Sequence, residues 1–278
     1  MTTMWWRLTL TSDPANADAI AAIVVALTAN GVEEPHPGTV CTTLESEAAA
    51  NALADRLRNA FPGLTATLET THPIDWSTRW RDGIATREFG RLLLTPSWLP
   101  VVAAGDQVVV TIDPESAFGS GEHGSTRGAL ALLERHLRPR DRVLDLGSGS
   151  GILAIAAVML GARSAIGIEV DEESMPIAEG NASRNRVQHG VTFLQGDAAE
   201  LAPLAGPAEV ICSNILRSVN TLLMPAILAA LAPSGIVIFA GMEAVEADLF
   251  RPVLEAHRLH PVDEVRDGGW WSVAARVR

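Results

Sequence analysis

The spacing of hydrophobic and polar residues predicts two differently built parts of the chain, which meet near residue 70. The first part alternates between strand-type runs and stretches with helical spacing, at residues 5–11, 14–30, 39–44, 46–60 and 64–70. Ser46 is placed to cap the second helix, and Pro62-Gly63 to end it. With a strand near Val32, ahead of a turn at Pro35-His36-Pro37-Gly38, the order is βαββαβ, which predicts a small ferredoxin-like α+β domain over residues 1–70.

Beyond residue 107, short apolar runs alternate regularly with helix-like segments. The predicted strands are residues 143–146, 165–169, 191–194, 209–212 and 235–239. This alternation favours an α/β domain, a doubly wound parallel sheet with helices on both faces and ligands outside the carboxyl ends of its strands. Residues 259–265 and 270–277 form a predicted hairpin that adds an antiparallel C-terminal strand. We therefore predict one large domain over residues 108–278.

The intervening segment, residues 71–107, is irregular, and we predict a linker followed by short strands. It mixes tryptophans with arginines: Trp76, Trp80 and Trp98 with Arg79, Arg81 and Arg87. Such mixing also occurs where aromatic rings stack on nucleic-acid bases, but in an acidic chain we favour packing against the next domain.

A glycine-rich turn in the large domain predicts a nucleotide-type ligand. Residues 145–151, Asp-Leu-Gly-Ser-Gly-Ser-Gly, join a buried strand to a helix, so the backbone can bend tightly and offer free N–H groups. About 20 residues later Glu169 ends the next strand, where a carboxylate can accept the hydroxyl protons of a ribose. The dinucleotide fingerprint would need glycine in place of Ile152. The observed G-x-G-x-G spacing resembles the first motif of class I S-adenosylmethionine-dependent methyltransferases, a function we favour over a dehydrogenase.

Composition narrows the possible chemistry. The net charge of −12 argues against direct nucleic-acid binding and would suit a basic protein partner, although solubility alone explains it equally well. Lysine and tyrosine are both absent, so neither can serve as a base. Cys41 and Cys212 lack metal-ligand spacing, and we expect two buried, reduced thiols and no metal. The longest apolar stretch, residues 20–29, is too short to span a bilayer, so we expect a cytoplasmic protein with no membrane partner.

Three motifs together resemble one family, the enzymes that methylate large-subunit ribosomal protein eleven in bacteria. Residues 117–126, Ala-Phe-Gly-Ser-Gly-Glu-His-Gly-Ser-Thr, match the family loop A-F-G-T-G-x-H-x-T-T. Residues 145–157 match D-x-G-x-G-S-G-I-L-A-I-A-A, and residues 213–216, Ser-Asn-Ile-Leu, match A-N-I-L. The similarity is continuous from residue 108 to 216, fainter over 75–98 and only architectural before residue 70.

The resemblance implies S-adenosylmethionine as the cofactor, with Thr126, Gly147, Glu169 and Asn214 holding it. It also implies that the small N-terminal domain presents a basic ribosomal protein to the active site. The chain departs from the family pattern at several positions, and Ser120 and Ser125 replace threonines conservatively. Glu169 replaces the usual aspartate, which keeps the charge and lengthens the reach, and Gly124 is expected to loosen the loop.

Further candidate residues come from the turn, a strand end and the loop. Gly149 belongs to the turn, and Asp145 is expected either near the methionine end of the cofactor or only tying down the turn. Asp197 follows a strand and is expected to contact the adenine or merely to cap the next segment. The loop with Phe118 and Gly119 is expected to contact the cofactor, close over it and exclude water.

Methyl transfer from a sulfonium requires mainly that a neutral amine lie on the line of the S–CH₃ bond. We expect Asn214, a polar amide ending an apolar strand, to orient that amine beside Phe118, and His123 to order the loop rather than act as base. The predicted reaction is N-methylation of lysine side chains or the N-terminal α-amine of the ribosomal protein. Two alternatives remain: a related enzyme acting on another protein or a small molecule, and a non-catalytic cofactor-binding assembly protein.

Overall fold

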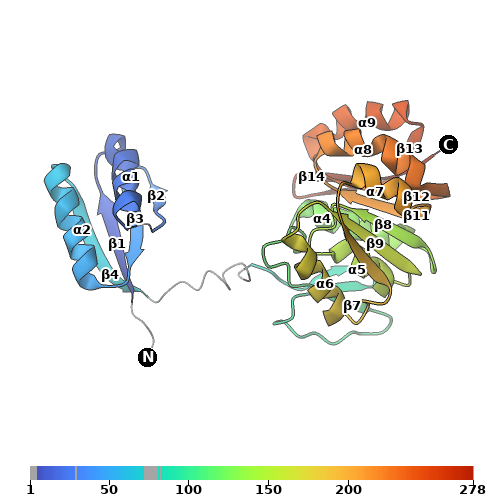
Figure 1. Ribbon diagram of the computed structural model, residues 1–278, viewed down its shortest axis with the longest axis horizontal. Coiled ribbons are helices and arrows are strands. Elements are labelled where there is room, and N and C mark those ends of the chain that lie inside the picture. Colours follow the sequence, from blue (N-terminus) through green and yellow to red (C-terminus); the bar gives the residue numbers. More distant parts are fainter. Residues whose placement is uncertain (1–4, 29, 72–80, 82, 278) are drawn as a thin grey trace. The chain divides into compact units, whose positions relative to one another are not determined.

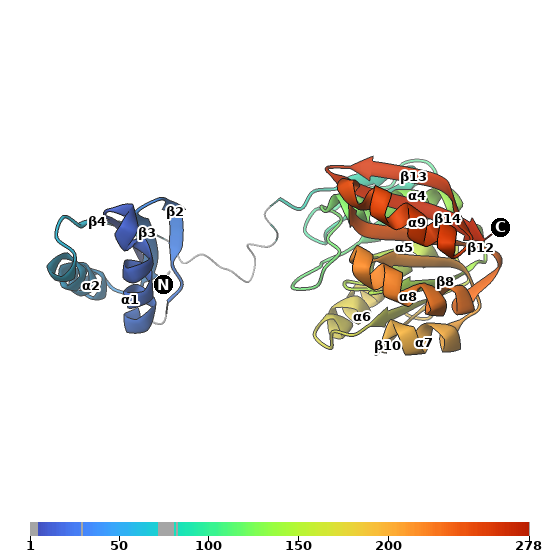
Figure 2. The ribbon, with the colours of Figure 1, turned by 90° about the horizontal axis from the view of Figure 1, so that it is seen from above.

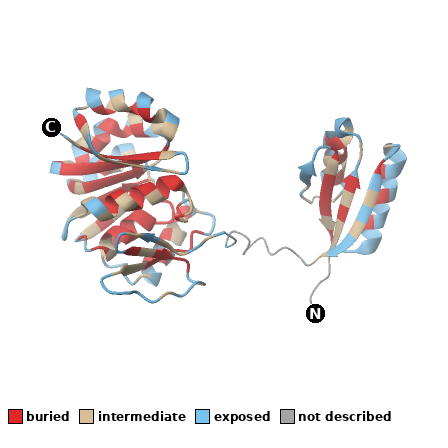
Figure 3. Cartoon of the chain, turned by 180° about the vertical axis from the view of Figure 1, so that it is seen from behind, coloured by how far each residue is buried: buried red, intermediate tan, exposed pale blue. Residues whose placement is uncertain are grey.

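The computed structural model describes residues 5–28, 30–71, 81 and 83–277. The chain divides into two compact units, residues 1–79 and 80–278 (Figure 1). In each unit, buried side chains concentrate on the strands and on the helix faces packed against them (Figure 3). Within the described ranges, no helix is both long and apolar enough to cross a membrane.

The N-terminal unit has the ferredoxin-like topology predicted from its sequence. Its elements are β1 (Trp5–Thr11), the short 3₁₀ helix η1 (Pro14–Asn16), α1 (Ala17–Thr28), β2 (Glu33–His36), β3 (Thr39–Leu44), α2 (Glu47–Ala60) and β4 (Thr65–Thr71). The sheet order is β2-β3-β1-β4, and β1 runs antiparallel to both of its neighbours. One prediction is wrong in detail: β2 extends over Pro35 and His36, and the turn follows it at Pro37-Gly38.

The alternation of apolar residues places the core of this unit between its sheet and its two helices. Leu8 and Leu10 of β1 are buried against residues of both helices, including Ile20 and Leu57, because alternate strand residues share one face of the sheet. Ser46 caps α2 as predicted, since its hydroxyl accepts a hydrogen bond from the Ala49 amide at 3.2 Å.

The C-terminal unit is an α/β domain around a seven-stranded sheet. The strands of the whole unit, which also include those of a second sheet, are β5 (Arg87–Phe89), β6 (Leu92–Thr95), β7 (Val108–Thr111), β8 (Arg142–Leu146), β9 (Ser164–Glu169), β10 (Val191–Gln195), β11 (Ala208–Asn214), β12 (Leu231–Glu243), β13 (Leu259–Asp267) and β14 (Trp270–Val277). Its helices are α4 (Gly124–His136), α5 (Ile152–Met159), α6 (Ser174–Arg184), α7 (Ala198–Ala205), α8 (Arg217–Ala230), the short 3₁₀ helix η2 (Ala244–Glu246) and α9 (Ala247–Ala256).

The main sheet has the order β10-β9-β8-β11-β12-β14-β13, with β10 and β13 at opposite edges (Figure 2). Strands β8 to β12 are parallel, whereas β14 runs antiparallel to both β12 and β13, as the predicted hairpin required. Helices α4, α5 and α6 cover one face, and α7, α8 and α9 cover the other (Figure 1). The predicted doubly wound parallel sheet with an antiparallel C-terminal strand is confirmed.

A second, three-stranded sheet packs on the α4 and α5 side of the unit, with the order β5-β6-β7. Helix α5 therefore lies between two sheets, which explains why residues 152–157 are apolar and buried all round the helix. β5 and β6 are short strands of the kind predicted after the linker within residues 71–107, and β7 comes from the predicted large domain. All three strands belong to the C-terminal unit.

Two smaller expectations concern the aromatic-basic segment and the cysteines. The guanidinium of Arg81 lies 4.9 Å from the ring centroid of Trp98, so this pair packs within the unit. Trp76, Trp80 and Arg79 lie outside the described residues. Cys41 and Cys212 are buried free thiols, as predicted.

Candidate active site

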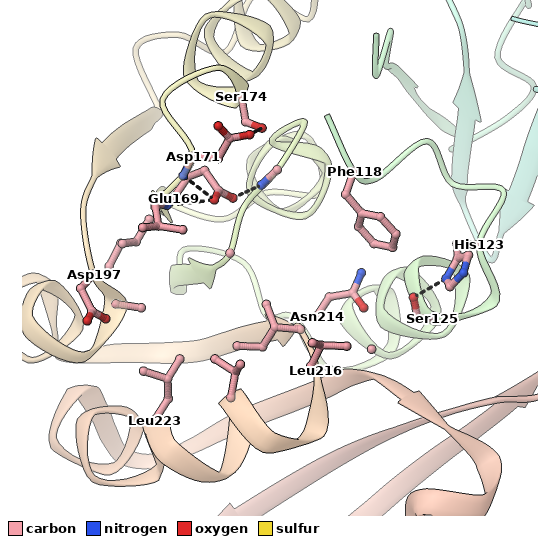
Figure 4. Close-up of a pocket in the computed structure, with 18 of the residues that line it drawn as sticks. Phe118, His123, Ser125, Glu169, Asp171, Ser174, Asp197, Asn214, Leu216 and Leu223 are labelled. Carbon is pink, nitrogen blue, oxygen red and sulfur yellow. Dashed lines mark hydrogen bonds between the residues drawn. The ribbon is translucent and has the colours of Figure 1, made fainter. Parts of the chain in front are cut away.

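A cavity of about 640 Å³ opens at the carboxyl ends of β8, β9, β10 and β11. The chain leaves β8 for β9 on one side of it and returns to β11 on the other, so the strand order reverses here. Such a switch point is where open α/β sheets bind ligands. Glu169 and Asp197 lie toward one end of the cavity, Phe118 and His123 lie toward the other, and Asn214 projects between them (Figure 4).

The glycine turn is shaped by the loop that packs on it. Gly149 has a φ of +50°, and a Cβ there would come within 2.5 Å of the Phe118 carbonyl oxygen, so only glycine fits. The Ser150 amide donates to that carbonyl at 2.9 Å, and the Ser150 hydroxyl donates to the Gly119 carbonyl at 2.7 Å. The loop backbone is therefore docked on the turn at Phe118 and Gly119. The Phe118 side chain remains 53% exposed.

The Glu169 carboxylate binds two backbone segments, the glycine turn and the turn that follows Glu169 itself. Its Oε2 accepts from the Gly149 amide at 2.8 Å, and its Oε1 accepts from the amides of Val170 and Asp171 at 2.9 and 3.0 Å. A carboxylate has about four acceptor positions, so three N–H groups leave it room for about one further donor. Glu169 thereby bridges its own turn and the glycine turn.

The other two predicted acids occupy different environments. Asp197 lines the cavity and caps α7, because its Oδ1 accepts from the Ala199 amide at 2.8 Å. Asp145 is only 1% exposed and does not line the cavity. Its Oδ2 accepts from the Ala154 amide at 3.1 Å in the first turn of α5, and its Oδ1 has no hydrogen-bond partner. The structure thus ties Asp145 to the helix behind the turn.

Burial raises the pKa of Asp145 to about 7. The Ala154 amide opposes this shift by stabilising the charged form, and the negative charge of Glu169 adds to it. Asp145 is therefore a carboxyl group that gains its charge only near neutral pH.

Asn214 ends β11, and its amide has one satisfied side and one free side. Its Nδ2 donates to the Thr126 hydroxyl at 3.2 Å, whereas its Oδ1 is buried and has no hydrogen-bond partner. Thr126 itself is fully buried behind Asn214 and does not line the cavity. Thr126 therefore orients the amide of Asn214, a residue that lines the cavity, and leaves its buried Oδ1 unpaired, so that an N–H group reaching this oxygen would relieve its desolvation cost.

Aromatic rings line the cavity next to Asn214. The His123 ring lies edge-on to Phe118, with centroids 5.3 Å apart, and 4.2 Å from the ring of Trp270. Its Nδ1 shares a hydrogen bond of 2.9 Å with the Ser125 hydroxyl. Burial lowers the pKa of His123, and the positive charge of Arg127 lowers it further, so the ring is neutral at pH 7.

Gly124 is not a point of looseness, contrary to the expectation from sequence. It is buried as the first residue of α4, and a Cβ there would lie 2.3 Å from the Asp267 carbonyl oxygen and 2.8 Å from the Trp270 ring. The same hairpin is held by Arg127, which binds the Asp267 carboxylate with two nitrogens at 2.6 and 2.8 Å. Glycine at 124 allows the β13–β14 hairpin to pack closely on the loop.

A second cavity, of about 450 Å³, lies on another side of the same loop. Phe118 and His123 line both cavities, whereas Gly119, a predicted cofactor contact, lines only the second. Its wall also contains two acidic residues, Glu115 and Glu122. Glu122 is paired with Arg87, and Glu115 is exposed.

The structure thus brings six of the predicted residues to the main cavity: Phe118, Gly147, Gly149, Glu169, Asp197 and Asn214. Thr126, Asp145 and Gly119 support these residues from behind or beside them. Sequence reasoning missed Trp270 and Ser125 as lining residues. Ser125 lies within the loop motif of residues 117–126 and could have been included from it, whereas no motif contains Trp270, which reaches the cavity only through the β13–β14 hairpin.

Comparisons with known proteins agree with this architecture. Residues 37–278 match the profile of a family described as "Ribosomal protein L11 methyltransferase (PrmA)". The ribosomal protein L11 methyltransferase of Pelotomaculum thermopropionicum is 35% identical over 88% of this chain and 78% of its own length. That of Thermus thermophilus is 36% identical over 72% of this chain and 76% of its own length. The crystal structure of ribosomal protein L11 methylase from Lactobacillus delbrueckii subsp. bulgaricus has a TM-score of 0.62 and 31% identity, covering 69% of this chain and 99% of that one.

Proposed function

Because the chain belongs to the ribosomal protein L11 methyltransferase family, we propose that it methylates amine nitrogens of ribosomal protein L11, on lysine side chains, the N-terminal α-amine or both. The chain is an S-adenosylmethionine-dependent methyltransferase. One observation carries the choice of an amine acceptor: the buried, unpartnered Oδ1 of Asn214 beside aromatic rings. An N–H group of an incoming amine is the partner that this oxygen lacks.

The residues present fit the methyl donor. The cavity volume of about 640 Å³ suits a drug-sized ligand. Glu169 has room for a ribose hydroxyl, and Asp197 offers a carboxylate to the adenine end. Gly147 and Gly149 line the cavity where the middle of the ligand would lie, and having no side chain they leave that space free. S-adenosylmethionine, when bound, supplies a methyl group on a positively charged sulfur.

The transfer itself is a displacement at the methyl carbon. The nitrogen lone pair forms the new N–CH₃ bond as the S–CH₃ bond breaks, and the positive charge moves from sulfur to nitrogen, which then releases a proton to solvent. Asn214 accepts an N–H of the amine and so points its lone pair along the cavity, while Thr126 prevents the amide from turning. The rings of Phe118, His123 and Trp270 exclude water and provide faces that tolerate the charge developing on nitrogen.

The second cavity is the route we propose for the acceptor side chain. It meets the main cavity at Phe118 and His123, where the amine must arrive. Glu115 gives its wall a negative charge that would attract a lysine ammonium. The acidic chain, with a net charge of −12, would attract a basic ribosomal protein as a whole. The cytoplasmic location, where such proteins are made, stays a prediction from the sequence.

The test is a methylation assay with purified protein, methyl-labelled S-adenosylmethionine and recombinant ribosomal protein L11. Because the chain contains no lysine, every labelled methyl-lysine found by mass spectrometry must come from the acceptor. We expect label on lysine or on the N-terminal amine of L11, and loss of label in Asn214→Ala. Label on another protein or a small molecule in a ribosome-free lysate, with none on L11, would replace the proposed substrate. Cofactor binding without any transfer would indicate an assembly protein.

A further inference from the structure

β7 is an edge strand of the three-stranded sheet, with β6 on one side only. The amide of Ile112, the residue after β7, faces β6 and donates to the Thr95 carbonyl at 2.9 Å. Since backbone groups alternate along a strand, the N–H and C=O groups of Thr111 and Asp113 face the opposite way, where no strand lies. Such edge groups need other partners when they are shielded from water.

Helix α6, which lies beside β7 (Figure 1), brings two asparagines that supply these partners, Asn181 within the helix and Asn185 at its end. Asn185, just after the last helical residue, accepts from the Thr111 amide at 2.8 Å and donates to the Thr111 carbonyl at 2.6 Å. Asn181 accepts from the Asp113 amide at 3.0 Å and donates to the Asp113 carbonyl at 3.1 Å. A carboxamide carries the same donor and acceptor as a peptide group. One helical turn, about 6 Å for four residues, matches about 6.6 Å for two strand residues.

Asn181 also connects this strand end to the glycine turn. It is fully buried, and its Nδ2 donates to the Ser150 carbonyl at 3.0 Å. Ser150 in turn binds the backbone carbonyls of Phe118 and Gly119. The loop that carries Phe118 is therefore anchored twice, at its start through Asp113 and at its middle through Ser150. Asn181 touches both anchors.

We propose that Asn181 and Asn185, the asparagine clamp, are positioning residues for methyl transfer. The clamp sets the loop of residues 113–121 against the glycine turn and thereby fixes Phe118 at the cavity wall. Neither asparagine lines the cavity, so neither is a catalytic residue. The proposal rests on the proposed function only in that S-adenosylmethionine is the ligand of the main cavity.

Residue-resolved amide hydrogen exchange of the full chain tests the clamp itself. In Asn185→Ala we expect the Thr111 amide to exchange about 10-fold faster or more, because it loses its acceptor. The Ile112 amide, which faces β6, serves as the internal control and should not change. In Asn181→Ala the same acceleration should appear at Asp113. Equal exchange at Thr111 and Asp113 in parent and variants would overturn the clamp.

Cofactor affinity tests the positioning role. By calorimetry we expect S-adenosylmethionine to bind about 10-fold more weakly to Asn181→Ala and about 3-fold more weakly to Asn185→Ala, on the scale of one lost buried hydrogen bond. Leu254→Ala is the matched control, because Leu254 is fully buried in α9 on the other face of the main sheet. It should lower the Tm as much and leave the affinity unchanged.

The outcomes separate the two proposals. Should the variants show faster exchange but bind the cofactor as Leu254→Ala does, the clamp is structural and its positioning role is wrong. Should the parent protein fail to bind S-adenosylmethionine, the proposed function fails, while the exchange pattern still decides whether the clamp exists. If Asn181→Ala does not fold, Asn185→Ala alone decides, because half-buried Asn185 leaves the Ser150 bond intact.

Discussion

The two units of the chain treat buried polar groups differently. Among the described residues of the N-terminal unit, Thr42 is the one buried polar residue, and its hydroxyl is satisfied by the Gly31 carbonyl at 3.0 Å. The C-terminal unit buries a larger set: Thr95, Asp113, Ser125, Thr126, Asp145, Ser148, Ser150, Ser174, Asn181, Ser213, Asn220 and Ser272. Most of them come from the glycine turn, the strand ends and the helices that begin there.

Burying a polar group costs free energy unless it is paired. The C-terminal unit carries that cost at the carboxyl edge of its sheet, and within the described ranges it also holds the buried side-chain atoms that lack a partner, including Oδ1 of Asp145 and Oδ1 of Asn214. In the described part of the N-terminal unit, the core is apolar and no buried side-chain N or O atom lacks a partner. We therefore propose that the chemistry takes place in the C-terminal unit and that the N-terminal unit acts through its surface.

Removing the N-terminal unit is the strongest way to break this comparison. A fragment of residues 80–278 should fold and bind S-adenosylmethionine, since the cavity is lined by its own residues. We expect methylation of ribosomal protein L11 to fall about 1,000-fold, because a recognition surface is worth several kcal/mol. Scintillation counting of labelled L11 measures this. Undiminished methylation by the fragment would show that the N-terminal unit does not recognise the substrate.

A core substitution in the N-terminal unit should leave the site intact. Leu57 is fully buried in α2, so Leu57→Ala should destabilise its unit by about 2–5 kcal/mol through the lost packing and the cavity left behind. Calorimetry should show that the unfolding transition of the N-terminal unit moves to lower temperature. Cofactor affinity should remain like that of the parent. A matching loss of affinity would mean that the two units are not independent in folding.

The buried acid behind the glycine turn gives a pH-dependent prediction. The pKa of Asp145 is about 7 in the folded chain, above its ordinary value of 3.8. Because the folded chain holds the Asp145 proton more tightly than the unfolded chain does, this group favours folding most at acid pH. That contribution falls as pH rises from 3.8 to about 7 and is constant above about 7. Relative to the parent, Asp145→Asn should therefore gain on the order of 3 kcal/mol between pH 4 and pH 8.

Urea unfolding of the parent and of Asp145→Asn between pH 4 and pH 8 measures the difference between their free energies of unfolding. Effects of the remaining carboxyl groups, which are common to both proteins, cancel in this difference. A difference independent of pH would show that Asp145 is ionised in the folded protein throughout.

The smallest effect is expected at the cavity wall. Asn214→Ala should lower kcat for methyl transfer by about 10- to 100-fold, which corresponds to losing a hydrogen bond to the nitrogen as it gains positive charge. Cofactor affinity should change less. Gln195→Ala is the control, since Gln195 is also a strand-end carboxamide but is exposed and does not line the cavity. Asn214→Asp should slow transfer most at low pH, because its charge favours the protonated amine. Turnover like that of the parent in both Asn214 variants would make Asn214 a structural residue.

Local sequence patterns predicted much of this molecule. Strand and helix periodicity identified nearly every element, since burial of one face imposes its spacing on the chain. The glycines of residues 147–151 predicted the turn because a backbone at positive φ admits few other residues. Glu169, Asp197 and Asn214 could be found because the carboxyl ends of parallel strands meet at one edge of a sheet.

Only the tertiary structure decided what these residues bind and which others join them. Gly124 suggested a loose loop, but the β13–β14 hairpin, far along the chain, packs against it and requires glycine. No sequence motif singles out Asn181 and Asn185, and only the fold brings the edge of β7 beside them. Periodicity records whether a residue is buried, not which distant segment buries it. Polar partners such as Thr126 for Asn214 are therefore visible only once the chain is folded.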